Sequence, residues 1–198
     1  MLLPPDFFSH PDVVAIAREL LGKKLVTRID GVVTSGIICE TEAYAGVTDR
    51  ASHAFGGRRT ARTEVMYGPC GTAYVYLCYG MHSLFNIVTN EAGIPHAVLI
   101  RGIIPVEGKE IMLRRAGKEK ITREFGIGPG KVSKILGIHY SHSGMLLGGI
   151  GTSADQPAIW VEDTEEKIYP KIIQAGPRIG VAYAGDDALL PYRFSFPR

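Results

Sequence analysis

Two glutamates and a tyrosine occupy alternate positions in the segment Glu40-Thr41-Glu42-Ala43-Tyr44. In an extended strand, alternate side chains project to one face, which would here be acidic and aromatic. Carboxylates two positions apart lie roughly 7 Å from each other along a strand. A carboxylate beside an apolar, aromatic wall can act as a general base toward a water molecule, whereas two solvated strand glutamates would do no chemistry. The segment alone leaves both interpretations open.

Aromatic rings follow this segment closely along the chain. They belong to Tyr44, His53, Tyr74, Tyr76 and Tyr79. Stacking of a nucleobase on such a ring is worth roughly 1 to 3 kcal/mol per base. Tyr74 and Tyr76 share one strand face, so core packing is the competing interpretation for at least one of them, and a loop histidine is commonly a surface residue. Rings beside carboxylates suit the handling of an extruded nucleobase.

A hairpin with an apolar tip is predicted around Gly80-Met81, between strands at residues 72–79 and 82–89. A glycine in the first turn position suits a type II′ turn. Tyr79 then lies at the tip, where a large ring has little protein to pack against. Together with Met81 it resembles the wedges that minor-groove binders insert between base pairs.

Two further segments offer groups that bind anions. Arg58, Arg59 and Arg62 form a cluster in a loop that also contains Gly56-Gly57, which suits phosphates and equally suits a solvated surface. The sequence Gly128-Pro129-Gly130-Lys131 predicts the start of a helix with open N–H groups. It lacks the spacing of a Walker A motif, so helix capping is favoured over binding of a nucleoside triphosphate.

The pattern of elements predicts an α+β fold. Asp30-Gly31 is a strong two-residue hairpin signal between strands at residues 23–29 and 32–44, and residues 45–71 read as a long polar loop of functional importance. Hairpins dominate, with no alternation of strands and crossover helices, so we expect a curved, mainly antiparallel sheet with flanking helices and a protruding β-hairpin. Further helices are expected at 11–21, within 105–116 and at 130–136, and further strands at 97–104, 158–162, 178–183 and 192–196.

Composition narrows the class of protein. With 198 residues the chain suits one domain, residues 1–198, and its net charge of +2 permits nucleic acid as a partner without indicating it. Three cysteines without a C-x-x-C pair favour reduced thiols over a disulfide framework or a zinc site. No apolar run approaches the roughly 20 residues of a membrane span, and the N-terminus lacks the pattern of a secretory signal. We therefore expect a cytoplasmic protein without a membrane partner.

The order of several long motifs resembles the alkyladenine (3-methyladenine) DNA glycosylase family, in its bacterial type. The motifs are E-T-E-A-Y-A-G, A-S-H, G-G-R-R-T-A-R, G-T-A-Y-V-Y-L-C-Y-G-M and F-N-I, and they continue with V-L-I-R-G at 98–102, G-P-G-K at 128–131 and P-R-I-G-V-A-Y-A-G at 177–185. Their order and spacing follow the family over most of the chain. Some relatives carry an aromatic residue at the position of His82, and this chain begins almost directly at its first helix.

The resemblance implies a role for each site residue. Glu42 would activate a water that attacks the anomeric carbon of an extruded nucleotide, with the Arg101 side chain and the Ile179 backbone carbonyl holding that water. Asn86 would crowd the exocyclic amino group of guanine and so exclude the undamaged base. Tyr44, His53 and Tyr76 would enclose the damaged base, and DNA would be contacted by Tyr79, which fills the gap in the duplex, by Met81 and by Arg58, Arg59 and Arg62.

The implied reaction is hydrolysis of the N-glycosidic bond of alkylated or deaminated purines in double-stranded DNA, which leaves an abasic site for base excision repair. It requires no metal or organic cofactor, and a monomer bound to the nucleoid is expected. The absence of a lysine from the pocket motifs argues against Schiff-base chemistry and strand nicking. Preference among 3-methyladenine, 7-methylguanine, hypoxanthine and etheno adducts does not follow from the sequence.

Two other functions fit parts of the sequence. A noncatalytic module, such as an RNA-recognition domain of a translation enzyme, is compatible with a similar sheet, because architecture does not fix function. The carboxylate of Glu42 argues against it, since an anion repels phosphate. A hydrolase of free nucleosides would need neither the tip at Tyr79 nor the arginine loop.

Overall fold

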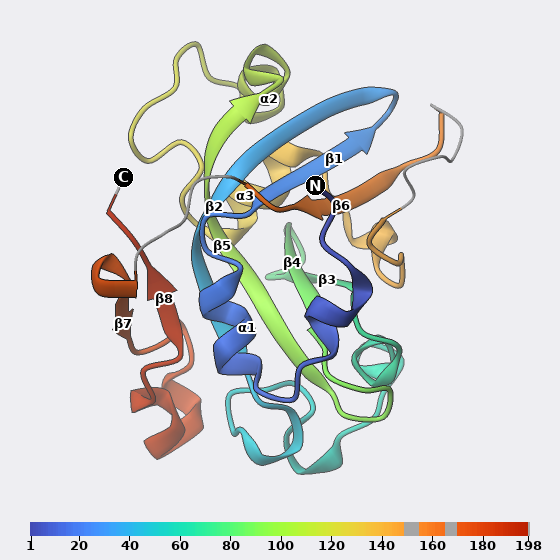
Figure 1. The fold of residues 1–198 in the computed structure, drawn as a ribbon, viewed down its shortest axis with the longest axis vertical. Coiled ribbons are helices and arrows are strands. Elements are labelled where there is room, and N and C mark those ends of the chain that lie inside the picture. Colours follow the sequence, from blue (N-terminus) through green and yellow to red (C-terminus); the bar gives the residue numbers. More distant parts are fainter. Residues whose placement is uncertain (149–154, 165–169, 198) are drawn as a thin grey trace.

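The computed structural model describes residues 1–148, 155–164 and 170–197. In this part of the chain eight antiparallel strands form one curved sheet, whose main path runs β3-β4-β5-β2-β1-β6, with β8 joined to β2 and β7 to β8 (Figure 1). The expected α+β fold is confirmed. The strands are β1 Lys24–Ile29, β2 Val32–Tyr44, β3 Ala73–Cys78, β4 His82–Thr89, β5 His96–Glu107, β6 Ala158–Glu162, β7 Gln174–Gly176 and β8 Arg193–Ser195.

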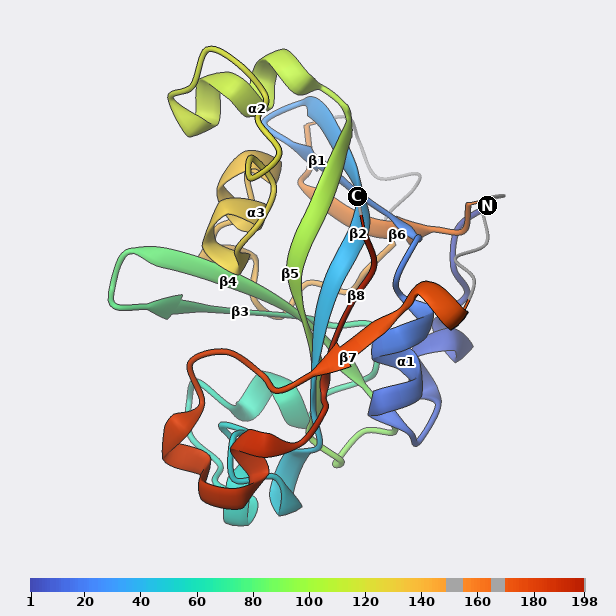
Figure 2. The same ribbon diagram turned by 90° about the vertical axis from the view of Figure 1, so that its left-hand side faces the viewer.

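Helices cover both sides of the sheet. Figure 2 shows α1 on one side of strands β5 and β2, with α2, α3 and the projecting β3–β4 hairpin on the other. The helices are α1 Val13–Glu19, α2 Lys109–Ala116 and α3 Pro129–Leu136, and the 3₁₀ turns are η1 Pro5–Ser9, η2 Gly46–Thr48, η3 Phe55–Gly57, η4 Glu64–Tyr67, η5 Tyr140–His142, η6 Pro170–Ile172 and η7 Ala182–Leu189. Among the described residues, no helix is both long and apolar enough to cross a membrane.

Most of the predicted helices and strands are present, with shifted ends. The first helix begins two residues later than expected, because the Asp12 carboxylate accepts hydrogen bonds from the N–H groups of Val14 and Ala15 at 2.9 and 3.1 Å and so caps the helix. Pro11 therefore lies outside the helix. The strand expected at 97–104 is longer at both ends, and α2 occupies the last eight residues of the range 105–116 in which it was expected.

The strand expected at 178–183 is wrong. Strand β7 ends at Gly176, and the following segment is irregular before it enters η7. The side chain of Arg178 is buried in an ion pair with Asp49, and Gly180 adopts a φ of 79°. These two features turn the backbone away from an extended path, although the β-branched and aromatic residues of the segment favour a strand.

The two predicted hairpins differ in how well the sequence specifies them. Asp30 and Gly31 have φ of 55° and 70°, as a type I′ turn requires, and Ile29 faces Val32. In the second hairpin the turn is one residue earlier than expected: Tyr79 and Gly80 are its central residues, with φ of 52° and 70°. The Met81 N–H donates to the Cys78 carbonyl at 3.1 Å, so the type II′ expectation is wrong.

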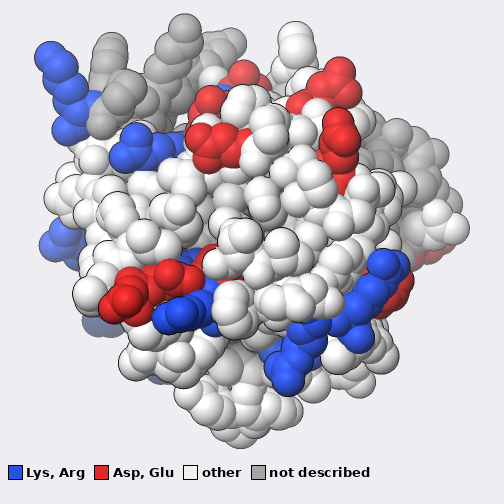
Figure 3. Space-filling view, turned by 90° about the horizontal axis from the view of Figure 1, so that it is seen from below, with Lys and Arg blue, Asp and Glu red and all other residues white. Residues whose placement is uncertain are grey.

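Residues 45–71 form a loop with regular turns and buried apolar residues, whereas a long polar loop was expected. It is built on η2, η3 and η4, and it buries Ala51, Ala54 and Met66. With η7 it forms the lower end of the molecule in Figures 1 and 2. Figure 3 views this end directly and shows small groups of acidic and basic side chains around a broad uncharged area, in keeping with the low net charge.

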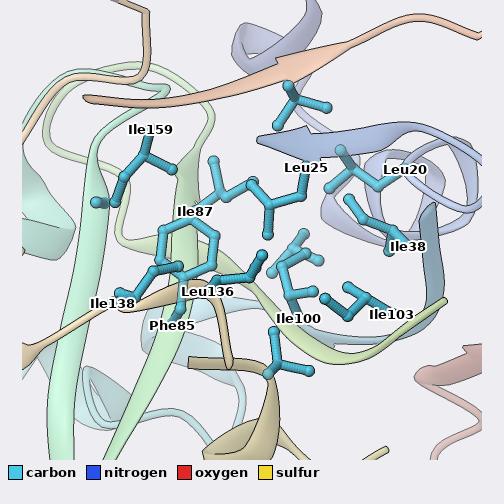
Figure 4. Close-up of a cluster of buried hydrophobic side chains, with 14 of the residues drawn as sticks. Leu20, Leu25, Ile38, Phe85, Ile87, Ile100, Ile103, Leu136, Ile138 and Ile159 are labelled. Atoms are coloured by element: carbon cyan, nitrogen blue, oxygen red, sulfur yellow. The ribbon is translucent and has the colours of Figure 1, made fainter. Parts of the chain in front are cut away.

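The apolar core fixes the strands that carry the site. Side chains from the sheet meet those of α1 and α3 in one cluster, which includes Leu25, Ile38, Phe85, Ile100 and Leu136 (Figure 4). Full burial of one such side chain stabilises the fold by about 1.5 to 3 kcal/mol. Strand β2 is therefore held rigidly, and its residue 42 is paired with Leu99 of β5 on one side and Arg193 of β8 on the other.

Candidate active site

A cavity of about 310 Å³ lies beside the sheet, and aromatic side chains form much of its wall. Its lining comes from the β3–β4 hairpin, the loop 45–71 and the segment 179–183, all on the same side of β5 (Figure 2). Tyr44, His53, Tyr74 and Tyr76 all line it, as do Asn86 and Arg101. The structure thus brings together residues that the sequence separates by more than fifty positions.

Glu42 is fully buried, with 0% exposure, and its carboxylate is surrounded by three residues that line this cavity. The Tyr44 hydroxyl donates to its Oε2 at 2.7 Å, and the Ile179 N–H donates to its Oε1 at 2.8 Å. Arg101 Nε lies 3.4 Å from Oε1. The carboxylate is therefore held by three residues of the cavity wall and is shielded from bulk solvent.

Burial and hydrogen bonding act in opposite directions on Glu42. Desolvation raises the pKa of this carboxyl, while Arg101, the Ile179 N–H and the Tyr44 hydroxyl lower it; burial dominates, so the pKa lies above its usual value. A carboxylate with a raised pKa is a better proton acceptor, and its three donors fix its orientation. This environment can serve a general base near neutral pH.

Arg101 lies between two carboxylates. Its Nε is 3.4 Å from Glu40 Oε1 and 3.4 Å from Glu42 Oε1, and Arg193 Nη1 is 3.1 Å from the same Glu40 oxygen. The alternation of positions 40 and 42 along β2 places both carboxylates against one guanidinium, despite a register shift at Glu40. The negative charges are thus balanced by two arginines.

His53 is part of the cavity wall. Its Nδ1 is 2.8 Å from the Tyr74 hydroxyl, and Arg62 Nη2 donates to its Nε2 at 3.0 Å. Because a guanidinium can only donate, we assign the ring proton to Nδ1, which donates to Tyr74. Burial, with Arg62 and Arg58 nearby, lowers the pKa of His53 to about 4, so the ring is neutral at physiological pH. Its centroid lies 4.7 Å from that of Tyr76.

Asn86 is fixed in the wall by its own strand and its neighbour. Its side-chain N–H₂ donates to the carbonyls of Tyr74 and Leu84 at 3.0 and 3.3 Å. Both amide hydrogens are thereby engaged, and the carbonyl end of the amide points away from these two backbone groups. The side chain is buried and cannot reorient without breaking both bonds.

The hairpin tip projects away from the body of the molecule (Figure 2). Tyr79 and Met81 are 87% and 74% exposed, and Tyr79 also borders the cavity. Within the part of the chain that the structure describes, these two side chains are largely free of packing contacts. The role of these residues as a wedge stays a prediction.

The three loop arginines do not form one patch. Arg59 pairs with Glu64 through two bonds of 2.6 and 2.7 Å, whereas Arg62 lies over the Tyr76 ring with its guanidinium carbon 4.6 Å from the centroid. Arg58 is exposed, and its backbone carbonyl accepts from the Tyr67 hydroxyl. Arg62 thus supports the cavity wall, and the phosphate-binding role of the cluster remains a prediction.

Two features near the cavity were missed by sequence reasoning. One is the buried ion pair of Arg178 and Asp49. The sequence indicated Arg178 only as part of the P-R-I-G motif and did not indicate its partner. The other is a groove of about 660 Å³ above the hairpin, which shares Pro129 with the cavity wall and touches His82. Its charged lining residues are Lys118, Lys120, Lys131, Lys134 and Glu124.

Metal-binding groups are not clustered near the cavity. Among residues 1–148, 155–164 and 170–197, no group of three or more His, Cys, Asp or Glu side chains is arranged to hold a metal ion.

Comparison with known proteins gives consistent results. The family model described as methylpurine-DNA glycosylase (MPG) matches residues 6–198. A protein of Chlamydia felis is 46% identical over 194 residues, covering 98% of this chain and 95% of the relative. Proteins of Chlamydia abortus and Bacillus cereus are each 45% identical, over 194 and 202 residues, covering 98% and 99% of this chain and 97% and 96% of the relatives. All three carry the provisional name 3-methyladenine DNA glycosylase.

Proposed function

The chain belongs to the methylpurine-DNA glycosylase family, and we propose that it is a monofunctional DNA-3-methyladenine glycosylase. It hydrolyses the N-glycosidic bond of alkylated or deaminated purines flipped out of duplex DNA and leaves an abasic site. Residues 1–198 act as one glycosylase domain, as a monomer, on DNA in the bacterial cytoplasm. The substrate follows from the family; the chemistry is argued from the site.

The observation that carries the proposal is the position of Glu42. Its carboxylate is fully buried and is oriented by Tyr44, Ile179 and Arg101, which all line the aromatic cavity. Burial of an ionisable group in this way costs free energy, and perturbed carboxylates of this kind are concentrated at functional sites. A noncatalytic module has no use for such a group.

In the proposed reaction a water molecule near Glu42 attacks C1′ of the extruded nucleotide. The water oxygen forms a bond to C1′ while the bond between C1′ and the purine nitrogen breaks, and the electron pair of that bond leaves with the base. One proton of the water passes to Glu42. The carboxylate also stabilises the positive charge that develops on the sugar. Arg101 and the Ile179 carbonyl are proposed to hold the water.

Selection of the base is attributed to the cavity wall. Alkylation makes a purine cationic and a better leaving group, and a cation stacks favourably on electron-rich rings such as Tyr44 and Tyr76. His53 suits this substrate because the low pKa of its ring keeps it neutral, so it does not repel a cationic base. Asn86 is proposed to exclude guanine by crowding its exocyclic amino group.

Binding to the duplex is attributed to the projecting hairpin and the basic groups around it. Tyr79, with Met81 beside it, is proposed to enter the base stack as the nucleotide is extruded, a step that costs a few kcal/mol and least for a badly paired base. The groove above the hairpin supports a polyanionic partner, because four of its five charged lining residues are lysines. Arg58, Arg59 and Arg62 are proposed to contact phosphates.

The test compares release of a free base from three substrates: duplex DNA carrying 3-methyladenine, duplex DNA carrying deoxyinosine, and free deoxyinosine. Release from either duplex and not from the nucleoside is expected, with no covalent adduct trapped by borohydride. Release from free deoxyinosine at a comparable rate would instead indicate a nucleoside hydrolase. Binding to the duplexes without release of either base would indicate a noncatalytic module.

A further inference from the structure

We propose that the buried ion pair between Arg178 and Asp49 is a positioning clamp, which holds the Ile179 N–H against the Glu42 carboxylate. Neither member touches the substrate in this proposal, which rests on the proposed function. The clamp acts on Glu42 through the adjoining backbone. It is therefore distinct from the residues expected to bind water or base.

The clamp joins three segments that surround the active site. Arg178 Nη1 and Nη2 lie 2.5 and 2.8 Å from the two Asp49 oxygens. Nη1 also donates to the Ala43 carbonyl on β2 at 2.8 Å, and Nη2 donates to the Asp187 carbonyl on η7 at 3.1 Å. One guanidinium thus ties the strand of Glu42 to the loop 45–71 and to η7.

Asp49 is fixed from its other side. Its carboxylate accepts hydrogen bonds from the N–H groups of Ala45 and Ala51, each at 2.9 Å. The Asp187 side chain in turn accepts from the Arg50 N–H at 2.8 Å. The Asp49 carboxylate therefore cannot move without breaking hydrogen bonds of the loop, so it holds the Arg178 guanidinium in place.

Ile179 has little anchorage of its own. Its side chain is 53% exposed, and the next residue is Gly180, with a φ of 79°. The N–H that donates to Glu42 belongs to the peptide directly after Arg178. Because Ile179 and Gly180 are both exposed, the position of the N–H depends on how firmly Arg178 is held.

The same guanidinium also contacts the second donor to Glu42. The Arg178 guanidinium carbon lies 4.9 Å from the centroid of the Tyr44 ring, and the Tyr44 hydroxyl is bonded to Glu42 Oε2. Two of the three groups that orient Glu42 therefore depend on Arg178. The third, Arg101, is held separately by Glu40 on β2.

Stability alone does not require this ion pair. Replacing a buried ion pair by apolar residues of similar volume is often neutral or stabilising, whereas removing one partner leaves a buried charge and is destabilising. A double variant that removes both charges therefore separates the two roles. It lacks the clamp without leaving an unpaired buried charge.

The clamp has a signature in the pH dependence of the rate. The charged and titratable groups that face Glu42 are Arg101 on β5, Glu40 and Tyr44 on β2, Arg178, and Tyr183 on η7. The Ile179 N–H lowers the pKa of Glu42, so its loss raises that pKa further above the usual value. Because the base must be ionised to act, the acidic limb of the rate profile then moves to higher pH.

The experiment compares wild type with the variant Arg178→Met/Asp49→Leu. Single-turnover release of 3-methyladenine from duplex DNA is followed from about pH 5 to about pH 9. We expect a folded protein with a lower melting temperature, because the N–H groups of Ala45 and Ala51 lose their acceptor. We also expect a maximal rate lower by about 10- to 100-fold and an acidic limb at higher pH. Lys24→Met is the control, since it breaks the Lys24–Glu162 ion pair on β1 and β6, away from the cavity.

A folded double variant with the wild-type rate and the wild-type acidic limb would overturn the proposal. Arg178→Lys is the second variant: it keeps the charge without the forked geometry and should show the same displaced limb. An NMR titration of the Glu42 side-chain carboxyl carbon gives a readout without turnover. If the wild-type protein proves inactive while the Glu42 titration is displaced in the double variant, the proposed function is refuted and the clamp is supported.

Discussion

Replacement of Tyr44 by Phe isolates one hydrogen bond to the proposed base. Tyr44→Phe keeps the ring that faces the cavity and removes the hydroxyl that lies 2.7 Å from Glu42 Oε2. That hydroxyl lowers the pKa of Glu42, so its loss raises a pKa that burial has already raised. The base is then protonated at higher pH, and the rate falls at the acidic end of the profile while it recovers at the alkaline end.

The size of this effect follows from the strength of the bond. A hydrogen bond to a charged group contributes about 1.5 to 3 kcal/mol, which corresponds to a rate lower by about 10- to 100-fold at a pH where the wild-type base is only partly ionised. The assay is single-turnover release of 3-methyladenine from duplex DNA, measured across the pH range. Stacking is retained, so binding should change little.

The matched control for this variant is Tyr140→Phe, which removes a hydroxyl from η5 outside the cavity. It should leave the profile where it is. If Tyr44→Phe lowers the rate equally at every pH, the hydroxyl does not act through the ionisation of Glu42. If it changes nothing, the reasoning about the donors to this carboxylate is refuted.

Three further outcomes are expected. Tyr79→Ser should weaken binding to damaged duplex and shift the extrusion equilibrium of a fluorescent base toward the stacked state; an unchanged equilibrium would remove the wedge. Neutralising Arg58, Arg59 and Arg62 should lower the salt slope of binding by about 0.9 for each DNA phosphate that the variant no longer neutralises, and an unaltered slope would show that they do not contact phosphates. Asn86→Ala should give measurable release of unmodified guanine from duplex DNA, and continued exclusion of guanine would assign that selectivity to another group.

The sequence specified features that depend on neighbouring residues. The Asp30-Gly31 turn follows from two positive φ angles that this pair tolerates, and the shared face of Glu40, Glu42 and Tyr44 follows from strand alternation. The turn and the shared strand face each depend only on residues a few positions apart in the sequence. For the same reason the sheet, the hairpins and the position of the acidic strand could be expected without coordinates.

Features that depend on distant residues could not be derived in this way. The Arg178–Asp49 ion pair joins positions 129 apart, and it converts a segment of strand-forming composition into an irregular support for Glu42. The Arg62 guanidinium lies over the Tyr76 ring, a contact that the sequence did not predict. In each case the partner that determines the structure is remote in sequence, so local propensity gives no sign of it.

The most direct measurement is single-turnover release of 3-methyladenine from duplex DNA by wild type and by Glu42→Gln. The amide fills the same space and can accept from Ile179, while the charge that burial disfavours is removed, so the variant should fold and bind damaged DNA. Its rate should be lower by about 100- to 10,000-fold, the usual contribution of a general base. A variant that releases the base at the wild-type rate would contradict the assignment of Glu42 as the group that activates water.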